Sequence, residues 1–116
     1  MDKKLIFLDI DGTLTSAMST PAPPVRQAIR QARAMGHLAF LCTGRNLPII
    51  SQDILDIGFD GVIASAGAYV SVGGQVLFDH LLPEALVQEC LEVFREFYNT
   101  SSVQDKESYT PVEFYK

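Results

Sequence analysis

The stretch Leu5-Ile6-Phe7-Leu8-Asp9-Ile10-Asp11-Gly12-Thr13 decides how the rest of the chain is interpreted. Its apolar start predicts a strand over residues 4–8 that is buried on both faces. Two carboxylates follow, and because Asp9 and Asp11 lie two residues apart in an extended chain, they point to the same side. Convergent carboxylates at a strand end favour a divalent cation such as Mg²⁺. Gly12 then allows a tight turn or the close approach of a ligand to the backbone.

The composition is that of an acidic, folded domain. The 116 residues are 47% hydrophobic and carry a formal net charge of −5, so a core is expected and a broad nucleic-acid surface is disfavoured. Cys42 and Cys90 lack metal or redox spacing, and we expect free, buried thiols in a reducing compartment. No signal peptide is recognisable and no apolar run could span a membrane. We therefore expect a cytoplasmic protein with no membrane partner.

Strands and helices alternate in the first half of the chain. Apolar runs predict strands over residues 4–8 and 37–42 and around residues 62–64, with a helix in each interval. This order predicts an α/β fold with a doubly wound parallel sheet. The first helix carries three arginines that we expect to face solvent: Arg26, Arg30 and Arg33.

The hydrophobic period changes in the second half. Residues 68–78 predict a β-hairpin on the turn Gly73-Gly74, and Pro83 is suited to opening a long helix. An apolar stripe on this helix is interpreted as core, and residues 112–115 as the start of a strand. The stripe consists of Leu86, Val87, Cys90, Leu91, Phe94, Phe97 and Tyr98.

Thr43-Gly44-Arg45 follows the second predicted strand, as Asp9 to Thr13 follow the first. A threonine hydroxyl and backbone amides at the start of a helix are groups that bind phosphate oxygens. Taken alone, this tripeptide fits a capping or turn role better. Its pairing with the two aspartates on a neighbouring strand end favours a phosphate site.

Three segments together resemble one family. They are DIDGTL at residues 9–14, LCTGR at 41–45 and FDGVIASAGAYV at 59–70. They resemble the haloacid dehalogenase (HAD) superfamily of phosphohydrolases, within it the Cof-like sugar-phosphatase branch. The resemblance covers nearly the whole chain. It implies a partial Rossmann-like core domain over residues 1–80 and the beginning of an inserted α/β cap domain over residues 81–116.

The resemblance also implies roles for individual residues. Asp9 would be the nucleophile that accepts the phosphoryl group, and Asp11 would protonate the leaving group and later activate water. Mg²⁺ would be held by the Asp9 carboxylate and the Asp11 backbone carbonyl. The phosphoryl oxygens would be bound by Gly12, Thr43 and Gly44. The expected substrate is a small phosphorylated metabolite, with sugar phosphates foremost, and phosphomutase chemistry stays open.

Two features depart from the family pattern. Many relatives carry Asn-Gly where this chain has Ala66-Gly67, so Ala66 receives no role. The family also needs a lysine and an acidic pair from later motifs, which these residues do not supply. We therefore expect an N-terminal fragment that is inactive alone, with an open sheet edge and self-association. The alternatives are a non-catalytic module that needs a partner chain, and a receiver-like phospho-acceptor domain.

Overall fold

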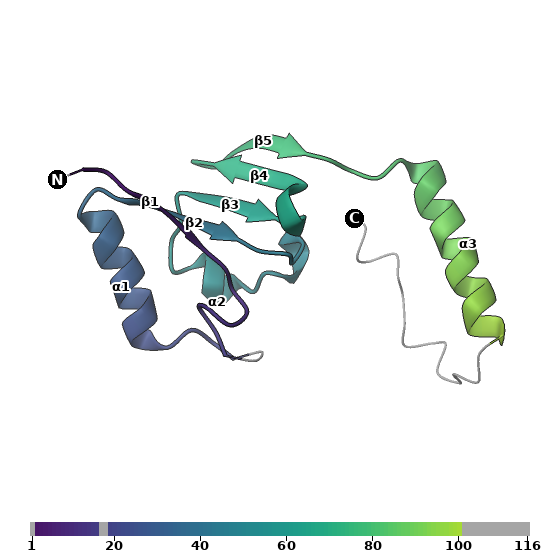
Figure 1. Cartoon of the computed structure of the whole chain (residues 1–116), viewed down its shortest axis with the longest axis horizontal. Coiled ribbons are helices and arrows are strands. Elements are labelled where there is room, and N and C mark those ends of the chain that lie inside the picture. Colours follow the sequence, from purple (N-terminus) through teal and green to yellow (C-terminus); the bar gives the residue numbers. More distant parts are fainter. Residues whose placement is uncertain (1, 17–18, 101–116) are drawn as a thin grey trace. The chain divides into compact units, whose positions relative to one another are not determined.

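The structure is a computed structural model that describes residues 2–16 and 19–100 (Figure 1). The chain divides into two compact units, residues 1–80 and residues 81–116, which are described separately. The elements of the first unit are β1 (Leu5–Leu8), α1 (Pro23–Ala34), β2 (Leu38–Cys42), a 3₁₀ turn (Leu47–Ile49), α2 (Gln52–Leu55), β3 (Gly61–Ala64), a second 3₁₀ turn (Ser65–Gly67), β4 (Tyr69–Val72) and β5 (Gln75–Asp79). The second unit contains α3 (Glu84–Thr100).

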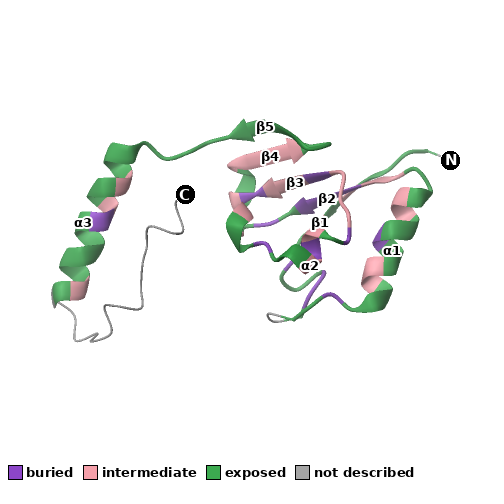
Figure 2. Ribbon diagram, turned by 180° about the vertical axis from the view of Figure 1, so that it is seen from behind, coloured by how far each residue is buried: buried purple, intermediate pink, exposed green. Residues whose placement is uncertain are grey.

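The five strands form one mixed sheet in the order β1-β2-β3-β4-β5. The first three strands are parallel, and β4 and β5 continue the sheet as an antiparallel hairpin. Gly73 and Gly74 both have positive φ angles, as the predicted two-residue turn requires. Because both crossovers advance in the same direction, α1 and α2 lie on the same side of the sheet (Figure 1 and Figure 2). The predicted α/β class is confirmed.

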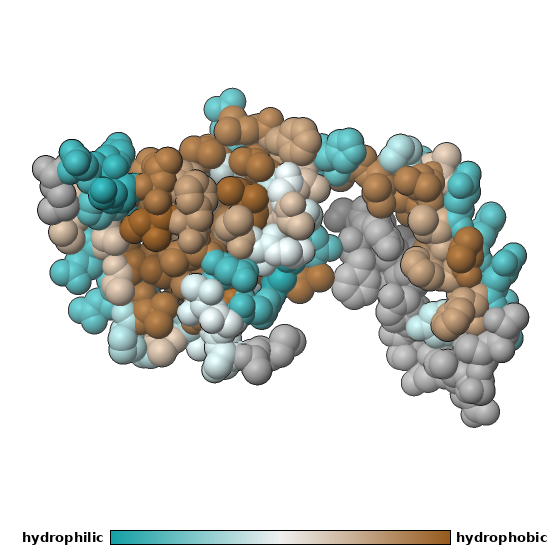
Figure 3. Space-filling model, viewed as in Figure 1, coloured by the Kyte–Doolittle hydropathy of each residue, from teal (hydrophilic) through white to brown (hydrophobic). Residues whose placement is uncertain are grey.

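β1 is an edge strand and is more exposed than predicted. The side chains of Leu5 and Phe7 are 57% and 55% exposed, whereas Ile6 and Leu8 are half-buried. The expectation of a strand buried on both faces is wrong for these residues, because within the described chain β1 pairs only with β2. Among the described strands β1 has no second neighbour, as the predicted open edge requires. Phe7 stacks on Phe40 of the neighbouring strand, with ring centroids 5.2 Å apart. Figure 3 shows apolar side chains gathered on the surface over this part of the sheet.

The core lies between the parallel strands and the helices α1 and α2, and β2, β3, α1 and α2 all contribute buried residues (Figure 2). α1 contributes Ile29, and the segment around α2 contributes three isoleucines. The buried cluster comprises Ile10, Leu14, Ile29, Ala39, Leu41, Ile50, Ile54, Ile57 and Ala64. The second helix is shorter than the apolar pattern predicts. A 3₁₀ turn precedes α2, which ends at Leu55, before Gly58 with its φ of +95°.

The three arginines of α1 do not simply face solvent, so that expectation is corrected. Arg26 donates to the backbone oxygen of Pro21 and forms an ion pair with Asp53 at 3.6 Å. Arg30 donates to the backbone oxygens of Ile57 at 3.1 Å and Asp56 at 3.0 Å. Carbonyls at a helix end lack intrahelical partners, so these bonds satisfy the end of α2 and tie α1 to it.

Arg33 forms the third of these connections. Its Nε and Nη2 atoms donate to both carboxylate oxygens of Asp60, at 3.0 and 2.9 Å. The same carboxylate accepts a hydrogen bond from the Ala39 backbone N–H at 2.9 Å. The Asp60 backbone oxygen accepts another from Gly73 N–H at 2.8 Å. Asp60, the residue directly before β3, thereby connects α1, β2 and the hairpin turn.

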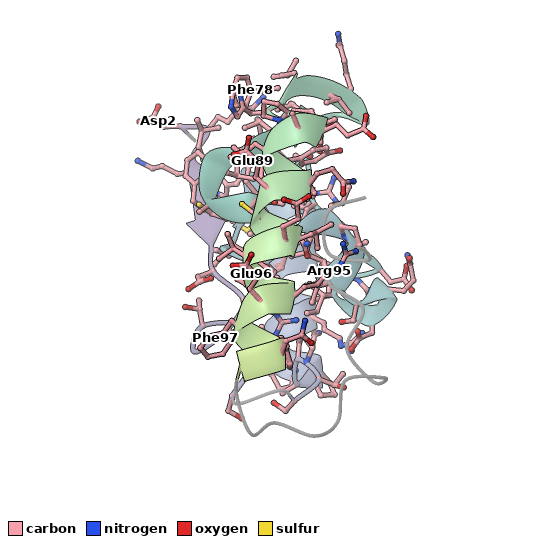
Figure 4. All side chains as sticks on the ribbon, turned by 90° about the vertical axis from the view of Figure 1, so that its right-hand side faces the viewer. Asp2, Phe78, Glu89, Arg95, Glu96 and Phe97 are labelled. Atoms are coloured by element: carbon pink, nitrogen blue, oxygen red, sulfur yellow. The ribbon has the colours of Figure 1, made fainter. Side chains whose placement is uncertain are left out.

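In the second unit, α3 spans the residues of the predicted apolar stripe. Leu91 is buried, but the exposed fractions of Leu86, Phe94 and Phe97 are 43%, 44% and 65%. The interpretation of the stripe as core is therefore wrong for these three residues. Figure 4 shows Phe97 and Arg95 on opposite sides of the helix. Residues 112–115, for which a strand is predicted, lie outside the described residues.

The structure also bears on two expectations from composition, which concern the cysteines and membrane-spanning segments. Both cysteines are free, but Cys42 is exposed and Cys90 half-buried, so the expectation of buried thiols is corrected. Cys42 is the last residue of β2, where the strand passes out of the core. Across the described residues, no helix combines the length and apolar character that a membrane span requires.

Candidate functional site

The segment after β1 is anchored by the side chain between the two aspartates. Ile10 is fully buried, whereas Asp9 and Asp11 on either side are exposed. The Ile10 carbonyl accepts hydrogen bonds from the next turn of the chain, donated by the backbone N–H groups of Thr13 at 3.2 Å, Leu14 at 3.0 Å and Thr15 at 3.0 Å. The alternation predicted from the sequence therefore places both carboxylates outside the core at the carboxyl end of β1.

Gly12 makes the turn after the aspartates possible. Its φ is +83°, a backbone conformation that residues with a Cβ adopt only at a cost, and its N–H donates to the Thr15 carbonyl at 2.8 Å. No described heavy atom lies within 4 Å of the position that a Cβ would occupy. The glycine is thus required by backbone conformation, and the space beside it is open.

The Thr43-Gly44 segment follows β2, the parallel neighbour of β1. Thr43 is buried, its N–H donates to the Ile63 carbonyl at 2.9 Å, and its hydroxyl oxygen accepts from the Arg45 N–H at 3.0 Å. Gly44 is exposed, and no described heavy atom lies within 4 Å of its hypothetical Cβ. The hydroxyl therefore shapes its own loop, which is the capping role that the sequence left open, while the Gly44 backbone faces open space.

Arg45 joins the two strand ends. Its Nε and Nη2 atoms donate to the two carboxylate oxygens of Asp11, at 2.9 and 2.5 Å. This hydrogen-bonded pair lowers the pKa of the Asp11 carboxyl and raises the pKa of the Arg45 guanidinium, and the charge of Asp9 raises the latter further. Arg45 thus contacts one of the two predicted catalytic residues directly.

The loop after β3 supports the site in a way the sequence did not predict. Ser65 N–H donates to the Arg45 carbonyl at 2.8 Å, and Ala66 N–H donates to the Thr43 carbonyl at 3.1 Å. Ser65 and Ala66 have φ angles of 51° and 53°, in the left-handed region that non-glycine residues seldom occupy. Ala66, which received no role, holds the Thr43 loop through its backbone. The Asn-Gly of many relatives was the available signal, because asparagine tolerates this conformation.

The donor set of the site fits a hard, oxygen-binding cation. Asp9 and Asp11 supply carboxylate oxygens, and one Asp9 oxygen accepts the Ile10 N–H at 2.8 Å. No group of three or more His, Cys, Asp or Glu side chains able to hold a metal occurs among the described residues. Two acids at one strand end match Mg²⁺ in chemistry and predict weak binding.

The sequence and the fold match proteins of one kind. The family model described as haloacid dehalogenase-like hydrolase matches residues 6–113. The chain is 29% identical over 92 residues to a Bacillus subtilis protein that bears the name "Putative phosphatase YkrA". This alignment covers 79% of the chain and 36% of that protein.

Solved structures agree with this match. A hypothetical protein of Geobacillus kaustophilus superposes with a TM-score of 0.73 at 26% identity, over 84% of this chain and 38% of that one. The HAD phosphatase BT1666 of Bacteroides thetaiotaomicron gives 0.66 at 28% identity, over 83% and 36%. The HAD subclass IIB sugar phosphatase BT4131 gives 0.65 at 32%, over 83% and 38%. The chain thus spans well under half the length of the relatives it matches.

Proposed function

Because the chain belongs to the haloacid dehalogenase-like hydrolase family, we propose that it carries the phosphoryl-accepting part of a Mg²⁺-dependent phosphohydrolase. One observation carries the proposal. The exposed aspartates Asp9 and Asp11 flank the fully buried Ile10 at the end of β1, next to β2, the strand that Thr43 follows. Ligands of open α/β sheets bind at the carboxyl ends of parallel strands, which is where these groups lie.

The proposed reaction has two steps. A carboxylate oxygen of Asp9 attacks the phosphorus and the bond to the leaving oxygen breaks. Asp11 gives that oxygen a proton, which requires that substrate binding first breaks the Arg45 contact that lowers the pKa of the Asp11 carboxyl. Asp11 then takes a proton from water, the water oxygen attacks the phosphorus, and the bond to Asp9 breaks, which releases inorganic phosphate. Asp9 thereby returns as a carboxylate and Asp11 as an acid. Both side chains are exposed, as residues that meet a substrate must be.

The remaining groups bind and orient the phosphoryl group. The open backbone at Gly12 and Gly44 would approach its oxygens, and the buried Thr43 holds the loop that carries Gly44. Bound Mg²⁺ would neutralise charge between carboxylate and phosphate. The Asp9 carboxylate and the Asp11 backbone carbonyl would hold the ion. The proposed substrates are small phosphorylated metabolites, with sugar phosphates first, supported by the match to a sugar phosphatase. The free cysteines favour a cytoplasmic setting.

Mg²⁺ titration tests the metal part of the proposal. We expect calorimetry of the 116-residue chain to show one weak site that Asp9→Asn removes and Asp79→Asn, at an exposed position on β5, leaves intact. Identical isotherms for the original chain and Asp9→Asn would overturn the metal site.

Phosphoryl trapping tests the chemical part. The chain is incubated with acetyl phosphate or p-nitrophenyl phosphate and Mg²⁺, quenched, reduced with borohydride and mapped by mass spectrometry. We expect slow labelling at Asp9, absent in Asp9→Asn, with little or no steady-state turnover by this chain alone. A label on any other residue would overturn the nucleophile assignment, and rapid turnover would overturn the expected inactivity.

A further inference from the structure

The bidentate contact with Arg45 distinguishes Asp11 from Asp9, the other aspartate at the end of β1. Both carboxylate oxygens of Asp11 accept N–H donors of one guanidinium, at 2.9 and 2.5 Å. Asp9 has a different partner, since one of its oxygens accepts the backbone N–H of Ile10 at 2.8 Å. The two acids are therefore held by different groups.

Arg45 is the fixed member of this pair. Its side chain is 19% exposed against 52% for Asp11. Its backbone is held on both sides, by N–H donation to the Thr43 hydroxyl at 3.0 Å and by acceptance from the Ser65 N–H at 2.8 Å. Arginine presents its donors in a planar fork that matches a carboxylate, so the pair defines the orientation of Asp11 as well as its charge.

We propose that Arg45 is a positioning residue that keeps the Asp11 carboxylate out of the metal shell, so that of these two aspartates only Asp9 supplies a carboxylate ligand. A cation that approached the Asp11 oxygens would displace two N–H donors and come close to a fixed positive charge. The Asp9 carboxylate is held by the Ile10 N–H instead of the guanidinium fork, although its charge also interacts with that of Arg45. The inference rests on the proposed function, and it specifies how one site assigns metal binding to one acid and proton transfer to the other.

A double-mutant cycle on Mg²⁺ affinity in the 116-residue chain is the test. Arg45→Met frees Asp11 to become a second carboxylate ligand, so we expect binding to tighten about tenfold, as added ligand charge does in carboxylate sites. Asp11→Asn should then weaken binding more in the Arg45→Met background than in the original chain. If Arg45 acts only as a nearby charge, the two effects are additive, and that result overturns the proposal.

Two further measurements guard against a variant that merely perturbs folding. Arg45→Lys keeps the charge but loses the fork, so the Asp11→Asn loss should grow there too, though less than with methionine. In the unsubstituted chain, the ¹⁵N-edited NMR signal of Arg45 Nε–H should persist when Mg²⁺ saturates the site. Loss of that signal on saturation would show that the metal takes the Asp11 carboxylate and would overturn the inference. Mg²⁺ binding that is absent or independent of Asp9 would instead defeat the proposed function itself.

Discussion

Two arginine–aspartate pairs of the same chemistry lie at opposite ends of the parallel strands. Arg33 and Asp60 meet at the amino end of β3, and Arg45 and Asp11 meet at the carboxyl ends of β2 and β1. Each guanidinium donates to both oxygens of its carboxylate. Asp60 also accepts the Ala39 N–H and is 22% exposed, whereas Asp11 is 52% exposed. The first pair connects elements of the fold, and the second leaves its carboxylate accessible to a substrate.

The largest expected contrast between these two ends comes from their glycines. A Cβ on Gly61, next to Asp60, would lie 2.4 Å from the Ser71 carbonyl oxygen and 2.7 Å from the Phe40 ring. Backbone cannot move aside cheaply, so we expect Gly61→Ala to lower the free energy of unfolding by about 3 kcal/mol. The matched change Gly12→Ala meets open space and adds only positive-φ strain, about 1 kcal/mol.

Urea unfolding followed by backbone amide NMR signals of β2 and β3 measures both losses within the first unit. Equal losses for the two alanine variants would contradict the crowding at Gly61. A greater loss for Gly12→Ala than for Gly61→Ala would show that the carboxyl end of the strands, and not the amino end, tolerates an added Cβ less well.

We expect Arg33 to affect the unfolding free energy and Arg45 to affect Mg²⁺ affinity. Arg33→Met leaves the partly buried Asp60 carboxylate with a single backbone donor, and we expect a loss of about 1–2 kcal/mol in unfolding free energy after allowance for solvent screening. Arg45→Met should leave the unfolding midpoint within experimental error, because Asp11 is exposed to water. Its expected effect is on Mg²⁺ affinity, which Arg33→Met should not change. Both quantities are measured on both variants. If the two variants changed unfolding free energy and Mg²⁺ affinity alike, the assignment of one pair to the fold and the other to the site would be wrong.

Acid should weaken the fold through Asp60. Its hydrogen bond to Arg33 lowers the pKa of the Asp60 carboxyl, and the bond from Ala39 N–H acts in the same direction. A carboxyl with a depressed pKa in the folded state contributes stability above its unfolded pKa, and this contribution is lost as the pH falls through the folded value. We therefore expect the unfolding free energies of the original chain and Asp60→Asn to differ at pH 7 and to converge below about pH 4. A difference that stays constant down to pH 2 would contradict the linkage.

The features that could be predicted from the sequence are those set by local geometry. Apolar periodicity and the Gly73-Gly74 turn report on local geometry, so the strands, the hairpin and the positions of Asp9 and Asp11 relative to Ile10 were predictable. The exposure of Phe7 was not, because a four-residue apolar run does not reveal whether a second strand pairs with it.

Long side chains were the other source of error. Arg33 lies on a helix face that a pattern of charge marks as solvated, yet it reaches Asp60, which is 27 positions away in the chain. Arg45 reaches Asp11 across 34 positions. Such pairs depend on which strands become neighbours, and that information appears only once the sheet is assembled. For the same reason the loop contacts of Ser65 and Ala66 could not be read from composition.

The smallest expected effect concerns Ala66, whose φ of 53° and ψ of 34° lie in the left-handed region. Alanine has no means of offsetting the contact between its Cβ and the backbone there, whereas asparagine adopts this conformation more readily. Ala66 is exposed, so the new side chain displaces no packed neighbour. We expect Ala66→Asn to raise the unfolding free energy by about 0.5 kcal/mol. The control is Ala28→Asn in α1, also exposed, where the lower helix propensity of asparagine should cost about 0.5 kcal/mol. Opposite signs for one substitution at two exposed alanines would establish the strained backbone beside Thr43, and a loss at both positions would contradict it.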